Sequence, residues 1–250
     1  MRYSSEKTQP YIFHQYGQIL KVGALILLMM MCFRFFFMFK FTDLVLLKKN
    51  LPTTFKGLFL GFRFDLSIVA VVLSLPFLVS TIGLIFNRER FLYFIPYFNR
   101  FWLLIFSIII MVVLVCDVNF YAFHQKHLSN EFFQVCAGPF NGIIHRLSRH
   151  YSLGLWIPVL LLEIVVIWFL FKRIFRRERI DLFYAQPIGK EGIFALLFSM
   201  FVLLSFLSRG NFSEKSLSLE DAAFSSIEHV NQLSVNGVMA FNRALQTQFY

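Results

Sequence analysis

The residues of this sequence that could do chemistry are charged side chains inside long apolar runs or at their edges. Arg34 and Glu163 each lie within such a run. A charge at the centre of a membrane-spanning helix costs about 2.5–3.5 kcal/mol on insertion scales, so it normally faces an opposite charge or a wet cavity. We therefore predict an intramembrane ion pair between Arg34 and Glu163, which would fix how their two helices pack. The alternative is that both residues line a substrate cavity.

A second group of polar residues stands where uncharged runs begin or end. Arg63 and Asp65 directly precede the uncharged run 66–86, and Asp117 ends the next apolar run. Because about 20 helical residues span the hydrocarbon core of a bilayer, the run 66–86 places Arg63 and Asp65 at the membrane surface. Asp117 is expected at the same level, on the outer side.

These residues, with His124 and Lys126 just beyond Asp117, predict an outward-facing site for the headgroup of an anionic lipid. In this hypothesis Arg63 and Lys126 contact the phosphate, and the carboxylates of Asp65 and Asp117 orient the two cations. The alternative is ordinary snorkelling of long side chains and capping of helix ends at the interface.

No motif of a known catalytic site occurs in the sequence. A phosphate-binding loop, a dinucleotide-binding fingerprint, HExxH and a nucleophile elbow are all absent. His124 and His127 can share a helical face, but two histidines are too few ligands for a metal site. The three cysteines follow neither a disulfide nor a zinc pattern. We predict no catalytic residue, no metal and no cofactor in this chain.

The composition indicates that a membrane surrounds the chain. Of the 250 residues, 58% are hydrophobic and 35 are Phe, and a water-soluble domain of this size could not bury so much apolar surface. The formal net charge of +10 is compatible with nucleic acid binding. However, the basic residues lie mainly between apolar runs rather than along one polar face, so we expect no nucleic acid partner.

An all-α integral membrane fold must position the charged residues: a five-transmembrane-helix bundle with interfacial helices on its outer side. The apolar runs that are long enough to cross a bilayer predict helices at residues 22–41, 59–86, 101–121, 153–171 and 192–208. The domain 22–208 that contains them is flanked by a cytoplasmic amino terminus, 1–21, and an extracytoplasmic linker, 209–250.

The orientation of the bundle follows from its basic residues, because Lys and Arg accumulate in short cytoplasmic loops. The segment KRIFRRER, residues 172–179, lies between the fourth and fifth predicted helices. It indicates an amino terminus in the cytoplasm and a carboxyl terminus outside, in a bacterial cytoplasmic membrane. Lys48 and Lys49, in the first outer loop, argue the other way.

Two outer segments are expected to be helical in part. Residues 124–152 predict short amphipathic helices at the interface. In the tail, Ser218 followed by Glu220 and Asp221 predicts the start of a helix. That helix would place on one side the apolar residues Ala222, Ile227 and Val230.

Three stretches resemble a known family. GFRFDLS (61–67) is similar to its second transmembrane helix, and DVNFYAFHQKHLSNEFF (117–133) is similar to the exit of its third. NQLSVNGVMAFNRAL (231–245) looks like the linker helix that follows the fifth. Over essentially its whole length, the chain resembles the amino-terminal membrane domain of the lipoteichoic acid synthase-like, sulfatase-fold phosphoglycerol or phosphoethanolamine transferases.

The resemblance implies a large extracytoplasmic catalytic domain after the linker, with a Thr nucleophile and a bound divalent metal, commonly manganese. Neither has a matching position in this sequence, so we expect no catalysis by this chain alone. The implied function is to anchor a phosphoglycerol-type headgroup transferase of the cell envelope and to present its lipid. The implied partners are an anionic phospholipid and a downstream or separate sulfatase-type catalytic domain.

Two alternatives stay open. A small transporter or permease-like subunit would use Arg34 and Glu163 within the bilayer, although no internal repeat supports it. A purely structural assembly protein would need neither the intramembrane pair nor the outer cluster for lipid chemistry.

Overall fold

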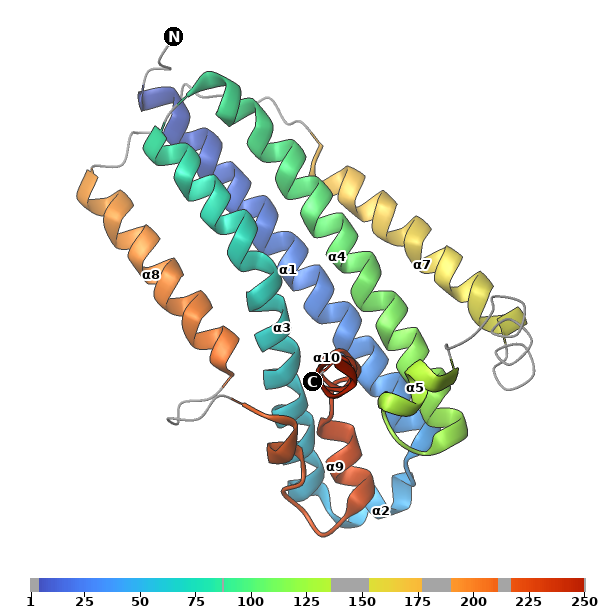
Figure 1. Ribbon diagram of the computed structural model, residues 1–250. Helices are drawn as coiled ribbons and strands as arrows, with labels where there is room; N and C mark the ends of the chain where they lie inside the picture. The colour runs from blue at the N-terminus through green and yellow to red at the C-terminus, as the bar shows by residue number, and fades with distance from the viewer. Residues whose placement is uncertain (1–4, 87, 136–152, 177–189, 211–216, 250) are drawn as a thin grey trace.

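The protein is a bundle of long helices with a tail of short helices folded against one end (Figure 1). The computed structural model describes residues 5–86, 88–135, 153–176, 190–210 and 217–249, and these are mainly helical. The long helices are α1 (Ser5–Phe41), α3 (Leu51–Phe86), α4 (Glu89–His124), α7 (Leu153–Ile174) and α8 (Lys190–Arg209). The short ones are α2 (Leu44–Lys49), α5 (Asn130–Val135), η1 (Leu219–Ala222), α9 (Glu228–Ser234) and α10 (Gly237–Phe249).

Helices α1, α3 and α4 form the centre of the bundle. They enclose a hydrophobic core that includes Ile26, Met30, Leu73, Leu103 and Met111. Helix α7 packs on α4 and α1, whereas α8 packs on α3 (Figure 1). The faces that point away from this core carry large apolar side chains with wide exposure. Such faces are expected where lipid, rather than water, surrounds a helix.

Within the described part of the chain, three helical segments are long and apolar enough to cross a membrane. They are Phe13–Phe41 of α1, Leu51–Gly83 of α3 and Arg90–His124 of α4. A shorter apolar segment, Leu197–Arg209, belongs to α8. Every apolar run that predicted a helix is helical in the structure, and α1, α3 and α4 extend beyond the predicted bounds.

The uncharged stretches of the three central helices end at a common level. On α1 the stretch ends at Arg34, on α3 it starts after Asp65, and on α4 it ends at Asp117. These three side chains line one small cavity, so they lie together in space. The three charged side chains therefore meet at one level, and all three helices continue beyond it with exposed apolar residues such as Phe39, Phe55 and Phe123.

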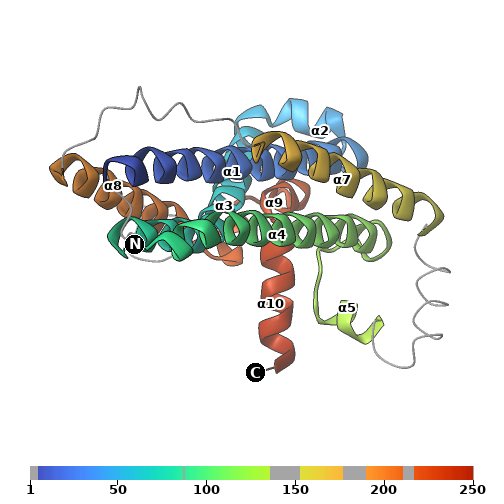
Figure 2. The same cartoon turned by 90° about the horizontal axis from the view of Figure 1, so that it is seen from above.

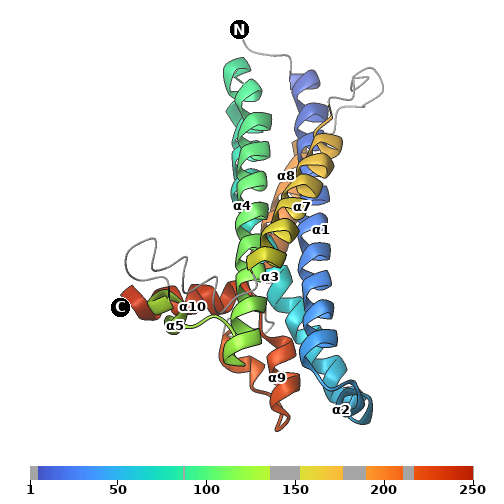
Figure 3. The ribbon, with the colours of Figure 1, turned by 90° about the vertical axis from the view of Figure 1, so that its right-hand side faces the viewer.

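The tail returns to this level after α8. A hydrogen bond from Leu217 N to Arg209 O, 2.9 Å long, fixes its start. Helix α9 packs on α3, and α10 then passes α4 and projects away from the bundle, roughly perpendicular to α4 (Figures 2 and 3). Helix α5 lies beside α10. The expected interfacial segment 124–152 thus contains one described helix, and residues 136–152 lie outside the described part.

The predicted helix start at Ser218 is confirmed, but the helix is short. Asp221 Oδ2 accepts a hydrogen bond from Ser218 N at 2.8 Å, which closes a capping box around η1. The chain leaves the helical conformation after Ala222, and α9 starts separately at Glu228. The predicted single helix with Ala222, Ile227 and Val230 on one side is therefore wrong, although Ala222 and Val230 are buried and Ile227 is partly buried.

Candidate functional site

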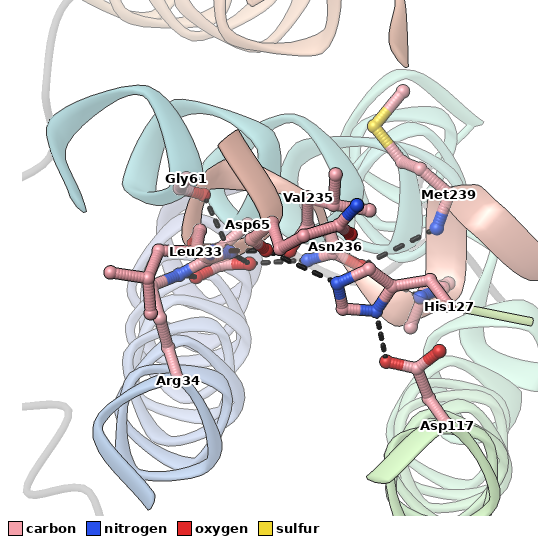
Figure 4. A network of polar contacts seen from close by, with 11 residues as sticks. Arg34, Gly61, Asp65, Asp117, His127, Leu233, Val235, Asn236 and Met239 are labelled. Carbon is pink, nitrogen blue, oxygen red and sulfur yellow. Dashed lines mark hydrogen bonds and ion pairs between the residues drawn. The ribbon is translucent and has the colours of Figure 1, made fainter. Parts of the chain in front are cut away.

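The most conspicuous polar feature of the structure is a buried network that joins the tail to the three central helices. We call it the polar clasp and define it as Arg34, Asp65, Asp117, His127 and Asn236 (Figure 4). Arg34 comes from α1, Asp65 from α3 and Asp117 from α4. His127 belongs to the loop after α4, and Asn236 to the turn between α9 and α10.

Arg34 and Asp65 form the charged half of the clasp. Nη2 of Arg34 lies 2.7 Å from Oδ1 of Asp65, and Nε lies 3.2 Å from Oδ2, so the contact is bidentate. The two side chains are only 6% and 1% exposed. A pair buried this deeply is stable only when further hydrogen bonds satisfy its remaining donors and acceptors.

The remaining Arg34 donors connect three parts of the chain. Nη2 donates to the carbonyl of Gly61 on α3 at 2.9 Å, and Nη1 donates to the carbonyl of Val235 at 3.2 Å. Nη1 also donates to the carbonyl of Leu233 at the end of α9. Hydrogen bonds from a charged donor are stronger than those between neutral groups. The Arg34 guanidinium therefore stabilises the packing of α1, α3 and the tail against each other.

Asn236 links the ion pair to the last helix. Its amide Nδ2 donates to Oδ1 of Asp65, and its Oδ1 accepts from Val238 N at 2.8 Å. The second contact caps the amino terminus of α10, where free N–H groups need acceptors. The same side chain therefore docks α10 on Asp65 and starts its helical hydrogen bonding.

Asp117 and His127 form the other half of the clasp. Oδ2 of Asp117 lies 2.7 Å from Nδ1 of His127, and Oδ1 accepts from Leu128 N at 2.9 Å. On its other side, Nε2 of His127 lies 3.1 Å from the carbonyl of Gln232 in α9. Both ring nitrogens of His127 thus face oxygen acceptors, and each nitrogen can make its hydrogen bond only when it carries a proton. The ring also stacks on Phe37, with 5.1 Å between centroids.

Two glycines make these close approaches possible. A Cβ atom on Gly61 would overlap the Arg34 guanidinium. A Cβ atom on Gly237 would lie 2.5 Å from Oδ2 of Asp117, which is closer than any real contact of this kind. Glycine is therefore required at both positions for backbone and charged side chain to meet.

The predicted pair of Arg34 with Glu163 is wrong. Arg34 pairs with Asp65, because α1 packs along α3 and the Arg34 donors are taken there and by the tail. Glu163 lies on α7, on the same helical face as Ile167 and Phe171, which are fully buried. Its Oε2 atom is buried and has no hydrogen-bond partner among the described residues.

The predicted headgroup residues do not form one site. Asp65 and Asp117 are closed off inside the clasp, whose cavity of about 30 Å³ is far smaller than a lipid headgroup. Arg63 holds the start of the tail, because its Nε donates to the carbonyl of Gly210 at 2.9 Å. His124 stacks on Phe120 with 4.2 Å between centroids.

Lys126 is the predicted headgroup residue that stays open to solvent, with 46% of its side chain exposed. Its Nζ lies 2.5 Å from Oε1 of Glu131 on α5. This hydrogen bond holds the pKa of the Glu131 carboxyl below its usual value. His124 Nδ1 lies 3.8 Å from the other oxygen of the same carboxyl group. Lys126 and His124 therefore belong to a rim outside the clasp.

Sequence reasoning missed the role of Asn236 and of the two glycines. The Asn-Gly pair at 236–237 is a turn and cap signal that precedes a helical pattern, and it could have placed the start of α10. No sequence signal could have matched Asn236 with Asp65, which lies far away along the chain. In the described residues, no group of three or more His, Cys, Asp or Glu side chains is arranged to hold a metal.

No protein-family model matches the chain, and comparison with curated proteins and with solved structures finds no match either.

Proposed function

We propose that this chain is the membrane-anchoring and lipid-presenting domain of a phosphoglycerol- or phosphoethanolamine-type headgroup transferase of the cell envelope. In this proposal it crosses a bacterial cytoplasmic membrane five times, with its amino terminus inside and the clasp outside. The observation that carries the proposal is the docking of the tail: hydrogen bonds of the clasp hold α9 and the start of α10 where the uncharged stretches of the central helices end.

A flexible tether would need no such docking. Burying the Arg34–Asp65 pair costs desolvation energy, which the hydrogen bonds to the tail offset only while α9 stays in place. Asn236 and Gly237 then set the direction in which α10 leaves the bundle (Figure 3). A sulfatase-type catalytic domain attached to α10 or bound beside it would be held at a constant height above the lipid, which suits attack on a headgroup.

Five crossings agree with the lengths of the outer helices. Helix α7 has 22 residues and α8 has 20, and at about 1.5 Å per residue each is as long as the hydrocarbon core is thick. Lys172 and Arg173 lie in the last turn of α7, at the end of the bundle where α1 begins (Figure 1). These two charges lie opposite the clasp, as expected if that end faces the cytoplasm, whereas Lys48 and Lys49 of α2 lie at the clasp end.

Headgroup labelling in cells tests this function. Cells with and without the gene are pulsed with radioactive glycerol or ethanolamine, and the label is followed from phospholipid into envelope acceptors. We expect the transfer of one of the two labels to fall without the gene and to return with the wild-type chain. A Ser74→Ala chain, altered at an exposed hydroxyl that bonds only within α3, should restore transfer equally well. Unchanged transfer of both labels in cells that lack the gene would refute the proposal.

One observation favours the alternative of a small transporter subunit. The buried, unpartnered Oε2 of Glu163 is the kind of intramembrane carboxylate that marks ion or substrate paths. A Glu163→Gln chain that loses uptake of a solute while headgroup labelling stays normal would support this alternative. Normal uptake in that variant would exclude it.

A further inference from the structure

A second, larger cavity lies outside the clasp. It has a volume of about 470 Å³ and opens between the loop after α4, helix α9 and helix α10. We call it the rim cavity. The polar side chains that line it, apart from His127 of the clasp, are Lys126, Ser129, Asn130, Gln232, Arg243 and Thr247. This volume lies within the range of about 300–1,000 Å³ that small-molecule sites occupy.

The rim cavity has a positive lining. Lys126 reaches it from the loop after α4, and Arg243 reaches it from α10. Among the described residues that line it, none is acidic. The carboxyl groups of Glu131 and Glu220 stand outside it, 2.5 Å from Lys126 and 4.0 Å from Arg243. Each contact uses only part of the donor set of an ammonium or a guanidinium, so both cations retain donors for another anion.

Neutral polar side chains and the apolar residues Leu128, Leu219, Val235, Ala240 and Ala244 make up the rest of the lining. The Ser129 hydroxyl lies against the cavity but is closed to solvent, and it has no hydrogen-bond partner among the described residues, which is costly unless it turns to meet a ligand. Asn130 Oδ1 accepts from the Thr247 hydroxyl at 2.8 Å, which leaves the Asn130 amide group as a donor and joins α5 to α10. Two cations with adjacent hydroxyl and amide donors are the usual partners of a phosphate oxygen.

We propose that the rim cavity binds a phosphate mono- or diester, with Lys126 and Arg243 as the charged contacts and Ser129 and Asn130 as neutral donors. The phosphate of a lipid headgroup can reach it, because α10 leaves the bundle at the level where the uncharged stretches end. A lipid as the source of that phosphate rests on the proposed function. Phosphate binding itself rests on the cavity alone.

Binding to the purified full chain tests the proposal. The first probe is glycerol 3-phosphate, titrated by calorimetry against protein in an uncharged detergent. The second is the preference of the protein for phosphatidylglycerol over phosphatidylcholine, read from the lipids that it retains from mixed bilayers. The variants are Lys126→Gln, Arg243→Gln and the two combined. The matched control is Lys48→Gln, which removes an exposed lysine of α2 that does not line the cavity.

We expect each single variant to weaken the binding of at least one probe about tenfold, and the combined variant to abolish it, while Lys48→Gln binds like wild type. Thermal melting checks that the variants fold, which the exposure of both side chains favours. Loss of glycerol 3-phosphate binding with no lipid preference supports a soluble phosphate ester. Loss of a phosphatidylglycerol preference supports the lipid headgroup.

Three results would overturn the proposal. These are wild-type binding by the combined variant, an equal loss in Lys48→Gln, and no binding of either probe by the wild-type chain. If one of these results is found while headgroup labelling still depends on the gene, phosphate binding in the rim cavity is refuted and the proposed function is not. Conversely, labelling that is unchanged without the gene, together with intact phosphate binding, would refute the proposed function but not phosphate binding in the rim cavity.

Discussion

Replacing Asp65 with Asn should release the tail from the bundle. The change removes the only carboxylate that pairs with Arg34 among the described residues and leaves a guanidinium that is 6% exposed without a counter-charge. Breaking a buried ion pair from one side costs about 3–5 kcal/mol. The leucine and valine carbonyls of the tail cannot neutralise the cation, so this cost falls on the docked state of α9 and α10.

Hydrogen exchange followed by mass spectrometry measures this effect directly in the detergent-solubilised protein. If the free energy needed to detach the tail from the bundle falls by about 3 kcal/mol, amides of α9 and α10 exchange roughly a hundredfold faster. Amides in the middle of α3 and α4 should keep their wild-type rates, because the apolar core that surrounds them is unchanged. The effect is therefore confined to the segment that the clasp holds.

Two further variants make the test specific. Asp43→Asn is the matched control, because Asp43 is exposed and caps α2 through Val45 N, a role that Asn fulfils equally well. Replacing both partners, by Arg34→Met with Asp65→Leu, should recover only part of the loss, because no unpaired charge of this pair then remains but the tail carbonyls and Asn236 lose their partners. Wild-type exchange of α9 and α10 in Asp65→Asn would show that the ion pair does not dock the tail, and our reasoning would be refuted.

Three other substitutions have expected outcomes that thermal unfolding of the purified protein can check. Gly237→Ala should destabilise the fold by about 1–3 kcal/mol, because the added Cβ would lie 2.5 Å from Asp117 Oδ2. Gly17→Ala, whose Cβ would have nothing within 4 Å, should be neutral or stabilising. Equal melting temperatures of the two variants would contradict the close approach at Gly237. His127→Phe keeps a ring to stack on Phe37 but loses both polar contacts, so a loss of about 2–4 kcal/mol is expected, and no loss would mean that the hydrogen bonds contribute little. Glu163→Leu should stabilise by about 1–3 kcal/mol, because it removes a buried oxygen without a partner; destabilisation would reveal a partner for that carboxyl group.

Much of the fold could be predicted from the sequence because apolar run length is a local property. The runs that predicted helices correspond to α1, α3, α4, α7 and α8. Asp65 and Asp117, which end two of those runs, were predicted to lie at the same level as each other, and both take part in the clasp. The capping pattern at Ser218 placed the start of η1, because such caps depend on residues only three positions apart.

The partner of Arg34 could not be predicted in the same way. Asp65 and Glu163 were both possible, and the choice depends on which helix lies beside α1 and how it is rotated. Helices that are apolar on all sides carry little periodic signal from which to read that rotation. The length of Arg34 allows it to reach in several directions, so the packing of α1 on α3 selected the pair.

By itself, the sequence determined that this chain forms long apolar helices and that a polar, partly helical tail follows them. It also determined at which residues the uncharged stretches of those helices end. Only the tertiary structure decided that the tail closes over those ends, so that Asp65 and Asp117 became internal fasteners and not headgroup ligands. It also brought Lys126 and Arg243, which come from distant parts of the chain, to the lining of one cavity. The physical reason is that a buried charge must find its hydrogen bonds wherever the folded chain supplies them, and here residues 233–236 supply them, far along the sequence from Arg34 and Asp65.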